Sequence, residues 1–429
     1  MMLAAVMAVV ASTIGLPGAS VGRASASASK IVIAAVAPFT GADAVLGPKY
    51  QTACYAAIQA INGAGGVLGR KLTCKTVDTR GDPADAVPAV RQMYATTPNL
   101  ALVIGCTSDE ASTVVPVFDA HKTVSFCMTG ESEFDSIHFP YFFRLVPPDA
   151  ADSVAMVKIA KIKGFSKIAL AFGNDAGSQT FVAPALAAIK KNGMSVVSNQ
   201  TLDINATTFQ TEAQAIVVSH PDAILMEALG AAGVALLTEI YQLNGNKMIP
   251  VIGTSAMIDP TFFSGVTTGP VGVQSFINNF DADNGTVNFG GPAYPLYKRL
   301  VLAQAGKVPG VPSFQGLLTA NGTVHLYDGI NLAALAMVMS HSTVGAKYKA
   351  DILKIAKGSP GATVVSSFAA GVKALKAGKK IQYLGVGGKY SFDAFQTAFG
   401  AFEDDQFKAD GTTVAVGASL GFCNLITCK

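Results

Sequence analysis

The sequence has few of the residues on which several classes of protein depend. It contains no tryptophan, five histidines and only 14% charged residues, with 31 Lys and Arg against 28 Asp and Glu. Because no run of Lys and Arg stands out, the chain lacks the electrostatic footprint of a nucleic-acid-binding protein. The scattered histidines and the absence of a Cys-x-x-Cys motif argue against a zinc site. We expect no nucleic-acid partner, no metal and no cofactor.

Sequence motifs of common enzymes are also missing. The chain has no Gly-x-Gly-x-x-Gly, no phosphate-binding Gly-x-x-x-x-Gly-Lys-Ser/Thr and no His-Glu-x-x-His. One pattern, "GASLG" at 417–421, has the spacing of a nucleophile elbow around Ser419. That motif requires an Asp and a His later in the chain, and neither follows Gly421. We interpret it as a chance match.

The first 28 residues predict a secretory signal peptide. Met1 to Leu16 carries no charge, and a stretch rich in Ser, Gly and Ala follows it, with a candidate cleavage site at Ala24 to Ala26. A buried first helix is the alternative, which the small polar residues disfavour. No later segment reaches the ~20 apolar residues needed to span a bilayer. We expect an exported protein of the periplasm or cell envelope that is soluble after cleavage.

From Lys30 the chain alternates apolar strand-like runs with amphipathic helix-like segments. This alternation restarts after residue 150, and the 429 residues are enough for two or three domains. Strands separated by helices indicate parallel sheets covered on both faces. We predict an α/β chain with two doubly wound lobes. Ligands bind at the carboxyl ends of such strands, so a cleft between the lobes is the expected site.

"VIGCTSDEAS", residues 103–112, marks the end of one predicted strand and the start of a helix. Cys106 near a helix N-terminus would have a lowered pKa, as a catalytic nucleophile requires. However, Cys127 closes the next strand, and adjacent parallel strands would bring both sulfurs to one edge. A Cys106–Cys127 disulfide in an oxidising compartment is the simpler hypothesis. Cys54 and Cys74 could pair in the same way.

Two further features of the sequence suggest a local disulfide and a site for a small anion. Cys423 and Cys428 are close enough in sequence to pair locally. Thr107 or Ser108 would stand at the N-cap of the helix that follows, beside unpaired N–H groups and the positive end of the helix dipole. That arrangement suits a small anion, while the alternative is that Ser108 only caps its helix.

The chain resembles the type I periplasmic solute-binding proteins of ABC transporters, in the branched-chain amino-acid-binding (Leu/Ile/Val-binding) group. The resemblance rests on seven phrases in the family's order: "IVIAAVAPFTGADAVLGP", "AIQAINGAGGVLGRKL", "DTRGDPADAV", "LALVIGCTSDEASTVVPVF", "YFFRLVPPD", "TVHLYDGINLAALA" and "LKAGKKIQYLGVGGKYSFD". It implies two lobes joined by a three-crossing hinge, with ligand in the cleft between them. Lobe I would be 30–145 and 278–378, and lobe II 146–277 and 379–429.

The resemblance also implies where a solute carboxylate binds. In the family, hydroxyls after the third and fourth strands hold it, and the matching positions are Ser108 and Ser132. Thr107, Thr129 and the backbone of Gly130 would lie nearby.

On the second lobe this chain departs from the family. Ala176, in the segment "GNDAGSQ" that also contains the candidate ligand-binding residue Asn174, stands where the family has a Tyr. Ser255 stands where the family has an acid that pairs with the ligand's ammonium. Leu46 replaces a Trp or Tyr in the first lobe. Glu227 could supply the missing charge from a neighbouring strand. The resemblance leaves open whether the solute carries an amine or is a carboxylate or amide without one.

The function implied is an exported, monomeric receptor that binds a small solute by hinge closure and delivers it to an ABC-transporter membrane permease. A ligand-sensing regulator on the same fold, signalling to a membrane partner, is the first alternative. An enzyme that uses Cys106 or Ser108 is the second.

Overall fold

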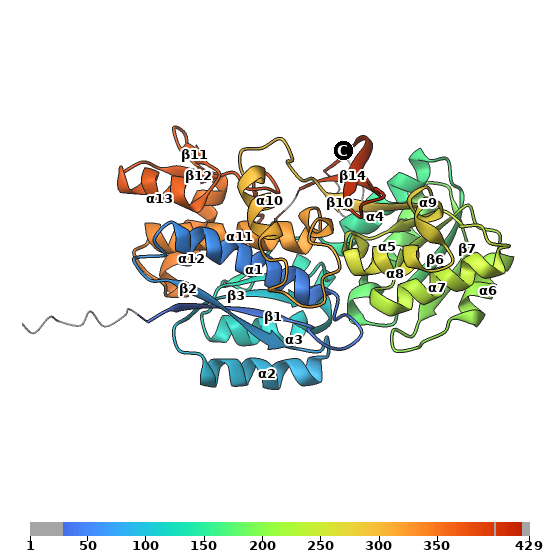
Figure 1. The fold of residues 1–429 in the computed structure, drawn as a ribbon, viewed down its shortest axis with the longest axis horizontal. Helices are drawn as coiled ribbons and strands as arrows, with labels where there is room; N and C mark the ends of the chain where they lie inside the picture. The colour runs from blue at the N-terminus through green and yellow to red at the C-terminus, as the bar shows by residue number, and fades with distance from the viewer. Residues whose placement is uncertain (1–28, 399, 423–429) are drawn as a thin grey trace, which may run out of the picture.

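The computed structural model describes residues 29–398 and 400–422, which form two lobes lying side by side (Figure 1). The predicted signal peptide, Cys423 and Cys428 lie outside the described residues. Each lobe is a sheet covered by helices, so the prediction of two α/β lobes is confirmed. Among residues 29–398 and 400–422, no helix combines the length and the apolar character that a membrane span requires.

The first lobe is built on a parallel five-stranded sheet with the spatial order β2-β1-β3-β4-β5. Its strands are β1 (Ile31–Ala37), β2 (Leu72–Asp78), β3 (Leu100–Thr107), β4 (Ser125–Met128) and β5 (Phe142–Arg144). The helices of this lobe are α1 (Leu46–Gly63), α2 (Pro83–Thr96), α3 (Ser108–Ala120), α10 (Tyr294–Leu302), α11 (Asn321–Met339), α12 (Gly345–Lys357) and α13 (Phe368–Lys376). Short elements complete it: η1 (Ser132–Asp135), η3 (Gly316–Leu318) and the pair β11 (Thr363–Val365) and β12 (Ile381–Tyr383).

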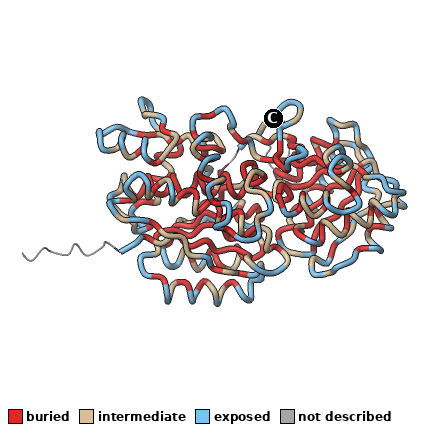
Figure 2. Tube along the Cα trace, viewed as in Figure 1, coloured by how far each residue is buried: buried red, intermediate tan, exposed pale blue. Residues whose placement is uncertain are grey.

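The sequence of β1 explains why this sheet needs helices on both faces. Ile31 and Ile33 pack into the core beneath α1 and α11, whereas Ala34 and Val36 pack into the core beneath α2 and α3. Successive residues of a strand point to opposite faces, so a strand covered on both sides is apolar throughout. The buried interior runs through the middle of each lobe in Figure 2.

The second lobe carries a seven-stranded sheet with the order β14-β13-β10-β9-β8-β6-β7. Its strands are β6 (Lys167–Gly173), β7 (Ser195–Leu202), β8 (Ala223–Glu227), β9 (Val251–Gly253), β10 (Phe280–Gly285), β13 (Ala401–Phe407) and β14 (Thr413–Phe422). Its helices are α4 (Asp149–Ile162), α5 (Ala176–Lys191), α6 (Gln210–Val218), α7 (Gly230–Leu243), η2 (Ser255–Met257), α8 (Pro260–Thr268) and α9 (Gly272–Ile277). Strands β6 to β10 are parallel to one another, and β13 and β14 extend the sheet as antiparallel strands.

The chain passes between the lobes after β5, after β10 and between β12 and β13. Two of the expected boundaries shift. Residues from 278 onward were expected in lobe I, but β10 pairs with β9 in the sheet of the second lobe. Residues from 379 onward were expected in lobe II, but β12 pairs with β11 beside the first lobe. β10 is hard to recognise because its buried positions include two aspartates, Asp281 and Asp283.

Candidate solute-binding cleft

A pocket lies between the lobes, at the carboxyl ends of strands from both sheets, and its space is about 740 Å³ including its open mouth. Residues of both lobes line it: Leu46, Lys49, Tyr50, Thr107, Ser108, Asp109, Met128, Gly130, Val146, Asp149, Asp152, Asp175, Gly177, Phe181, Glu227, Leu229, Thr254, Ser255, Ala256, Asn321 and Gly322. The predicted position of the site between the lobes therefore agrees with the cavity.

The corner at the end of β3 is shaped by a bulge. Gly105 has φ +104°, and a side-chain carbon there would lie 2.3 Å from the carbonyl oxygen of Val36, so only glycine fits. Gly105 pairs with Cys127 and the register then shifts, which leaves Cys106 as the extra residue beside Cys127. The predicted Cys106–Cys127 disulfide is present and joins the ends of β3 and β4. The Cys54–Cys74 disulfide is also present.

Thr107, rather than Ser108, is the residue that caps α3. The Thr107 N–H donates to Glu110 Oε1 at 3.1 Å, and the Thr107 hydroxyl donates to the other oxygen of Glu110. Ser108 is therefore free of the capping role. Its hydroxyl donates to Thr129 Oγ1 at 3.2 Å and accepts from the Gly130 N–H at 3.4 Å. The structure thus brings Ser108, Thr129 and Gly130 together, and Thr129 is fully buried.

Four of the predicted residues do not line the cleft, and the first of them is the buried Thr129. Ser132 is exposed at the start of η1, because the chain turns away after Gly130 packs against α4; a side-chain carbon on Gly130 would lie 1.7 Å from Asp149 Oδ1. Asn174 and Ala176 are exposed at the start of α5. Their neighbours Asp175 and Gly177 face the cavity instead. Glu227 and Ser255, the other predicted residues of this lobe, do line it.

Carboxyl groups dominate the polar wall of the cleft, and only Glu227 among them was predicted from the sequence. The lining contains Asp109, Asp149, Asp152, Asp175 and Glu227. A signal was available, since Asp109 follows β3 within the quoted "SDEAS" and Asp149 follows β5 within "YFFRLVPPD". Acids placed just after parallel strands gather at the ligand-binding edge of a sheet.

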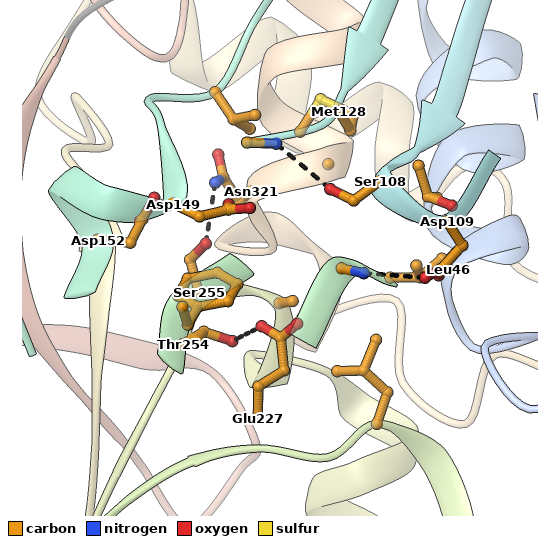
Figure 3. A pocket seen from close by; sticks show the side chains of 18 of the residues that line it. Leu46, Ser108, Asp109, Met128, Asp149, Asp152, Glu227, Thr254, Ser255 and Asn321 are labelled. Atoms are coloured by element: carbon orange, nitrogen blue, oxygen red, sulfur yellow. Dashed lines mark hydrogen bonds between the residues drawn. The ribbon is translucent and has the colours of Figure 1, made fainter. Parts of the chain in front are cut away.

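Glu227 is held from the second lobe at the end of β8, and only 6% of it is exposed. Its carboxyl accepts hydrogen bonds from the hydroxyls of Thr254 and, at 3.4 Å, Ser178. Burial raises the pKa of Glu227 well above its usual range, and the charges of Asp175 and Asp149 raise it further. Figure 3 shows Glu227 on the opposite side of the cavity from Ser108.

The basic residue of the lining, Lys49, is already paired. Its Nζ lies 3.2 Å from Asp259 Oδ2 and donates to the carbonyl of Ala256 at 3.0 Å, so it ties α1 of the first lobe to the second lobe. Within the described part of the chain, none of the ion pairs involves an acid of the lining. The cleft therefore presents unneutralised carboxyl groups to a solute.

Further contacts join the two lobes across the cleft. The Gly177 N–H of α5 donates to Asp109 Oδ1 of α3 at 3.0 Å, and Asn321 Nδ2 donates to Ser255 Oγ at 3.2 Å (Figure 3). Burial, together with the charge of Asp175, raises the pKa of Asp109 to about 6. Behind it, burial and the charge of Asp109 raise the pKa of Asp43 to about 8. A buried carboxyl without a cation favours its neutral form, so a bound cation would favour ionisation.

Two α/β lobes that enclose a polar cleft between strand ends define a two-lobed ligand-binding protein. The chain belongs to the periplasmic binding protein family, whose model matches residues 30–287. Members of this family are solute-binding components of ABC transporters rather than enzymes, and the described residues contain no group of His, Cys, Asp and Glu suited to a metal ion. The enzyme hypothesis is wrong, and Cys106 is bonded to Cys127.

Two curated relatives belong to the branched-chain amino-acid group. The chain is 34% identical over 101 residues to Leu/Ile/Val-binding protein homolog 3 of Brucella melitensis, a match to 24% of this chain and only 26% of that protein. It is 24% identical over 268 residues to Leu/Ile/Val-binding protein BraC3 of Rhizobium johnstonii, covering 62% of this chain and 71% of that protein.

Solved structures show the same fold at low identity. An ABC-transporter solute-binding protein from R. palustris, in complex with benzoate, matches with a TM-score of 0.70 and 16% identity over 94% of this chain and 100% of that one. A branched-chain amino acid transporter substrate-binding protein from Streptococcus pneumoniae, in complex with isoleucine, matches with a TM-score of 0.70 and 16% identity over 91% and 100%. One fold therefore accommodates solutes with and without an amine.

Proposed function

We propose that this protein is an exported receptor that captures a small solute carrying both a carboxylate and a protonated amine, and delivers it to an ABC-transporter permease. The observation that carries the proposal is the polarity of the cleft: hydrogen-bond donors gather on the first lobe around Ser108, and unneutralised carboxyls gather opposite them around Glu227. An α-amino acid presents these two charges.

The carboxylate would bind at the start of α3. The Ser108 hydroxyl and the Gly130 N–H converge there, beside the first N–H groups of the helix. Helix N-termini attract anions through these N–H groups and the helix dipole. The Cys106–Cys127 disulfide supports the corner from behind by holding the ends of β3 and β4 together. A hydrogen bond to a charged group contributes ~1.5–3 kcal/mol.

The amine would bind on the second lobe, against Glu227 and Asp175. A buried ammonium without a carboxylate partner is costly, and here the carboxylates are present without a basic partner. This wall favours an amine-bearing solute over a carboxylate or amide that lacks the amine. Solute contacts to both lobes would add to the Asp109–Gly177 and Lys49–Asp259 contacts and so favour the closed arrangement.

A thermal-shift screen of amino acids, aliphatic and aromatic acids and amides tests the proposal, because a ligand stabilises the folded state by mass action. We expect the largest shifts from amino acids. Ser108→Ala should weaken calorimetric affinity for the best of them at least tenfold, whereas the matched variant Ser132→Ala, outside the cleft, should leave it unchanged. Equal loss in both variants, or shifts from acids alone, would overturn the proposal.

A further inference from the structure

A second group of acids lines the cleft from α4, whereas Glu227 belongs to β8. Asp149 and Asp152 belong to the first turn of α4, directly after the chain first crosses between the lobes, and each is 6% exposed. Figure 3 shows both on the side of the cavity opposite Asp109. They come from a different element than Glu227, which ends β8.

Asp152 faces another carboxyl instead of a donor. The neighbour is Asp283 on β10, which is fully buried behind the wall, and a hydrogen bond between the two carboxyls requires that one of them keeps its proton. Two carboxyls that face each other cannot both ionise without a nearby cation. Burial and the facing charge of Asp283 accordingly raise the pKa of Asp152 well above its usual range.

The basic side chains nearest to this wall are engaged elsewhere. Arg144 is buried and directs its guanidinium to Asp135, to the carbonyl of Glu131 and to Thr397. Lys163, also on the α4 side of the lobe, lies 2.8 Å from Asp281 and 3.7 Å from Asp404. Neither ion pair includes Asp152 or Asp283. The charge of Arg144 lowers the pKa of Asp152, but burial and the charge of Asp283 outweigh it, so a cation in the cleft would favour ionisation of this pair.

Asp149 makes the wall a better cation acceptor. Its carboxyl accepts from the Thr180 hydroxyl, and its backbone N–H donates to the Gly130 carbonyl at 2.9 Å, which fixes the side chain beside the proposed carboxylate corner. A cation held by Asp149 and Asp152 would thus lie in the same cavity as the solute and apart from Glu227. Ser108, Asp149 and Asp152 line the same pocket between the lobes.

We propose that the solute carries a second cationic nitrogen, bound by Asp152 and Asp149 on α4, so that its class is the diamino carboxylates rather than the branched-chain amino acids. This inference rests on the proposed function and narrows it. The α-carboxylate occupies the Ser108 corner, the α-ammonium faces Glu227, and the side-chain cation faces the α4 wall.

Calorimetry with matched pairs of amino acids tests this inference. Ornithine and norvaline differ by the terminal amine, as do lysine and norleucine. We expect at least one diamino member to bind ten times or more tighter than its partner. Asp152→Asn should reduce that preference to threefold or less. Glu133→Gln, which removes an exposed acid on η1, should retain the preference.

The outcomes separate this inference from the proposed function. If norvaline or norleucine binds as tightly as its diamino partner, the second cation subsite is refuted while the amino-acid receptor stands. If pentanoate binds as tightly as norvaline and ornithine, both proposals fail. A preference that survives intact in Asp152→Asn also refutes the subsite. Should Asp152→Asn fold poorly, Asp149→Asn provides the same comparison.

Discussion

Replacing Glu227 by glutamine should separate solute affinity from stability. The substitution keeps the shape of the side chain and an acceptor for the Thr254 hydroxyl, and it removes the charge. An ammonium–carboxylate hydrogen bond contributes ~1.5–3 kcal/mol, which corresponds to a loss of affinity of roughly 10- to 150-fold. The solute-free protein should not lose stability, because burial already raises the pKa of Glu227 and no basic side chain among residues 29–398 and 400–422 forms an ion pair with it.

Calorimetry with the best amino acid from the screen, alongside thermal unfolding without solute, measures both quantities. Glu133→Gln is the matched control, since this acid is exposed and does not line the cleft. We expect affinity to fall only in Glu227→Gln, with the melting temperature equal to or above that of the parent protein. Unchanged affinity in Glu227→Gln would refute the role assigned to this carboxyl.

Two further predictions concern pH and the disulfides. Burial raises the pKa of Asp109 to about 6 and that of Asp43 to about 8, so the folded chain holds protons that the unfolded chain has released. The stability of the solute-free protein should therefore decrease as pH rises from about 4 to about 8. In thermal unfolding at a series of pH values, Asp43→Asn should make that decrease smaller. A melting temperature that rises over this range would contradict the assignment. The double variant Cys106→Ser/Cys127→Ser should lower the free energy of unfolding by about 3 kcal/mol and weaken solute binding. The double variant Cys54→Ser/Cys74→Ser has a similar sequence separation, 20 against 21, and should lower the free energy of unfolding by a similar amount without changing the affinity for solute. An equal loss of affinity in both folded variants would argue against a special role for the Cys106–Cys127 disulfide.

The fold was predictable where the chain follows simple periodicities. Runs such as "IVIAAVA" are apolar throughout because both faces of the sheet are covered, and this pattern identified the parallel strands of both lobes. β10 departs from the rule, since Asp281 and Asp283 occupy buried strand positions. β10 pairs with β9 and contacts Lys163 through Asp281, and these partners are distant in sequence, so they leave no local signal.

The sequence led to some of the residues that line the cavity on each lobe, including Ser108 on the first and Glu227 on the second. Ser108 and Gly130 follow from strand ends and helix capping, and Cys106–Cys127 follows from the neighbouring positions of two strands. Ser132 was misplaced because Gly130 packs against Asp149, which turns the chain outward. The acids of α4 and α5 were missed because the resemblance directs attention to Ala176 and Ser255. Whether Ala176 or its neighbours Asp175 and Gly177 face the cavity depends on where the first turn of α5 begins.

The most direct test of the central claim compares an amino acid with its own deaminated carboxylate in calorimetry on the wild-type protein at neutral pH. The proposed cleft binds the carboxylate at Ser108 and the amine at Glu227, so removal of the amine should cost at least tenfold in affinity. Equal affinity for the two compounds would contradict the account, because it would mean that the acidic wall takes no part in recognising the solute.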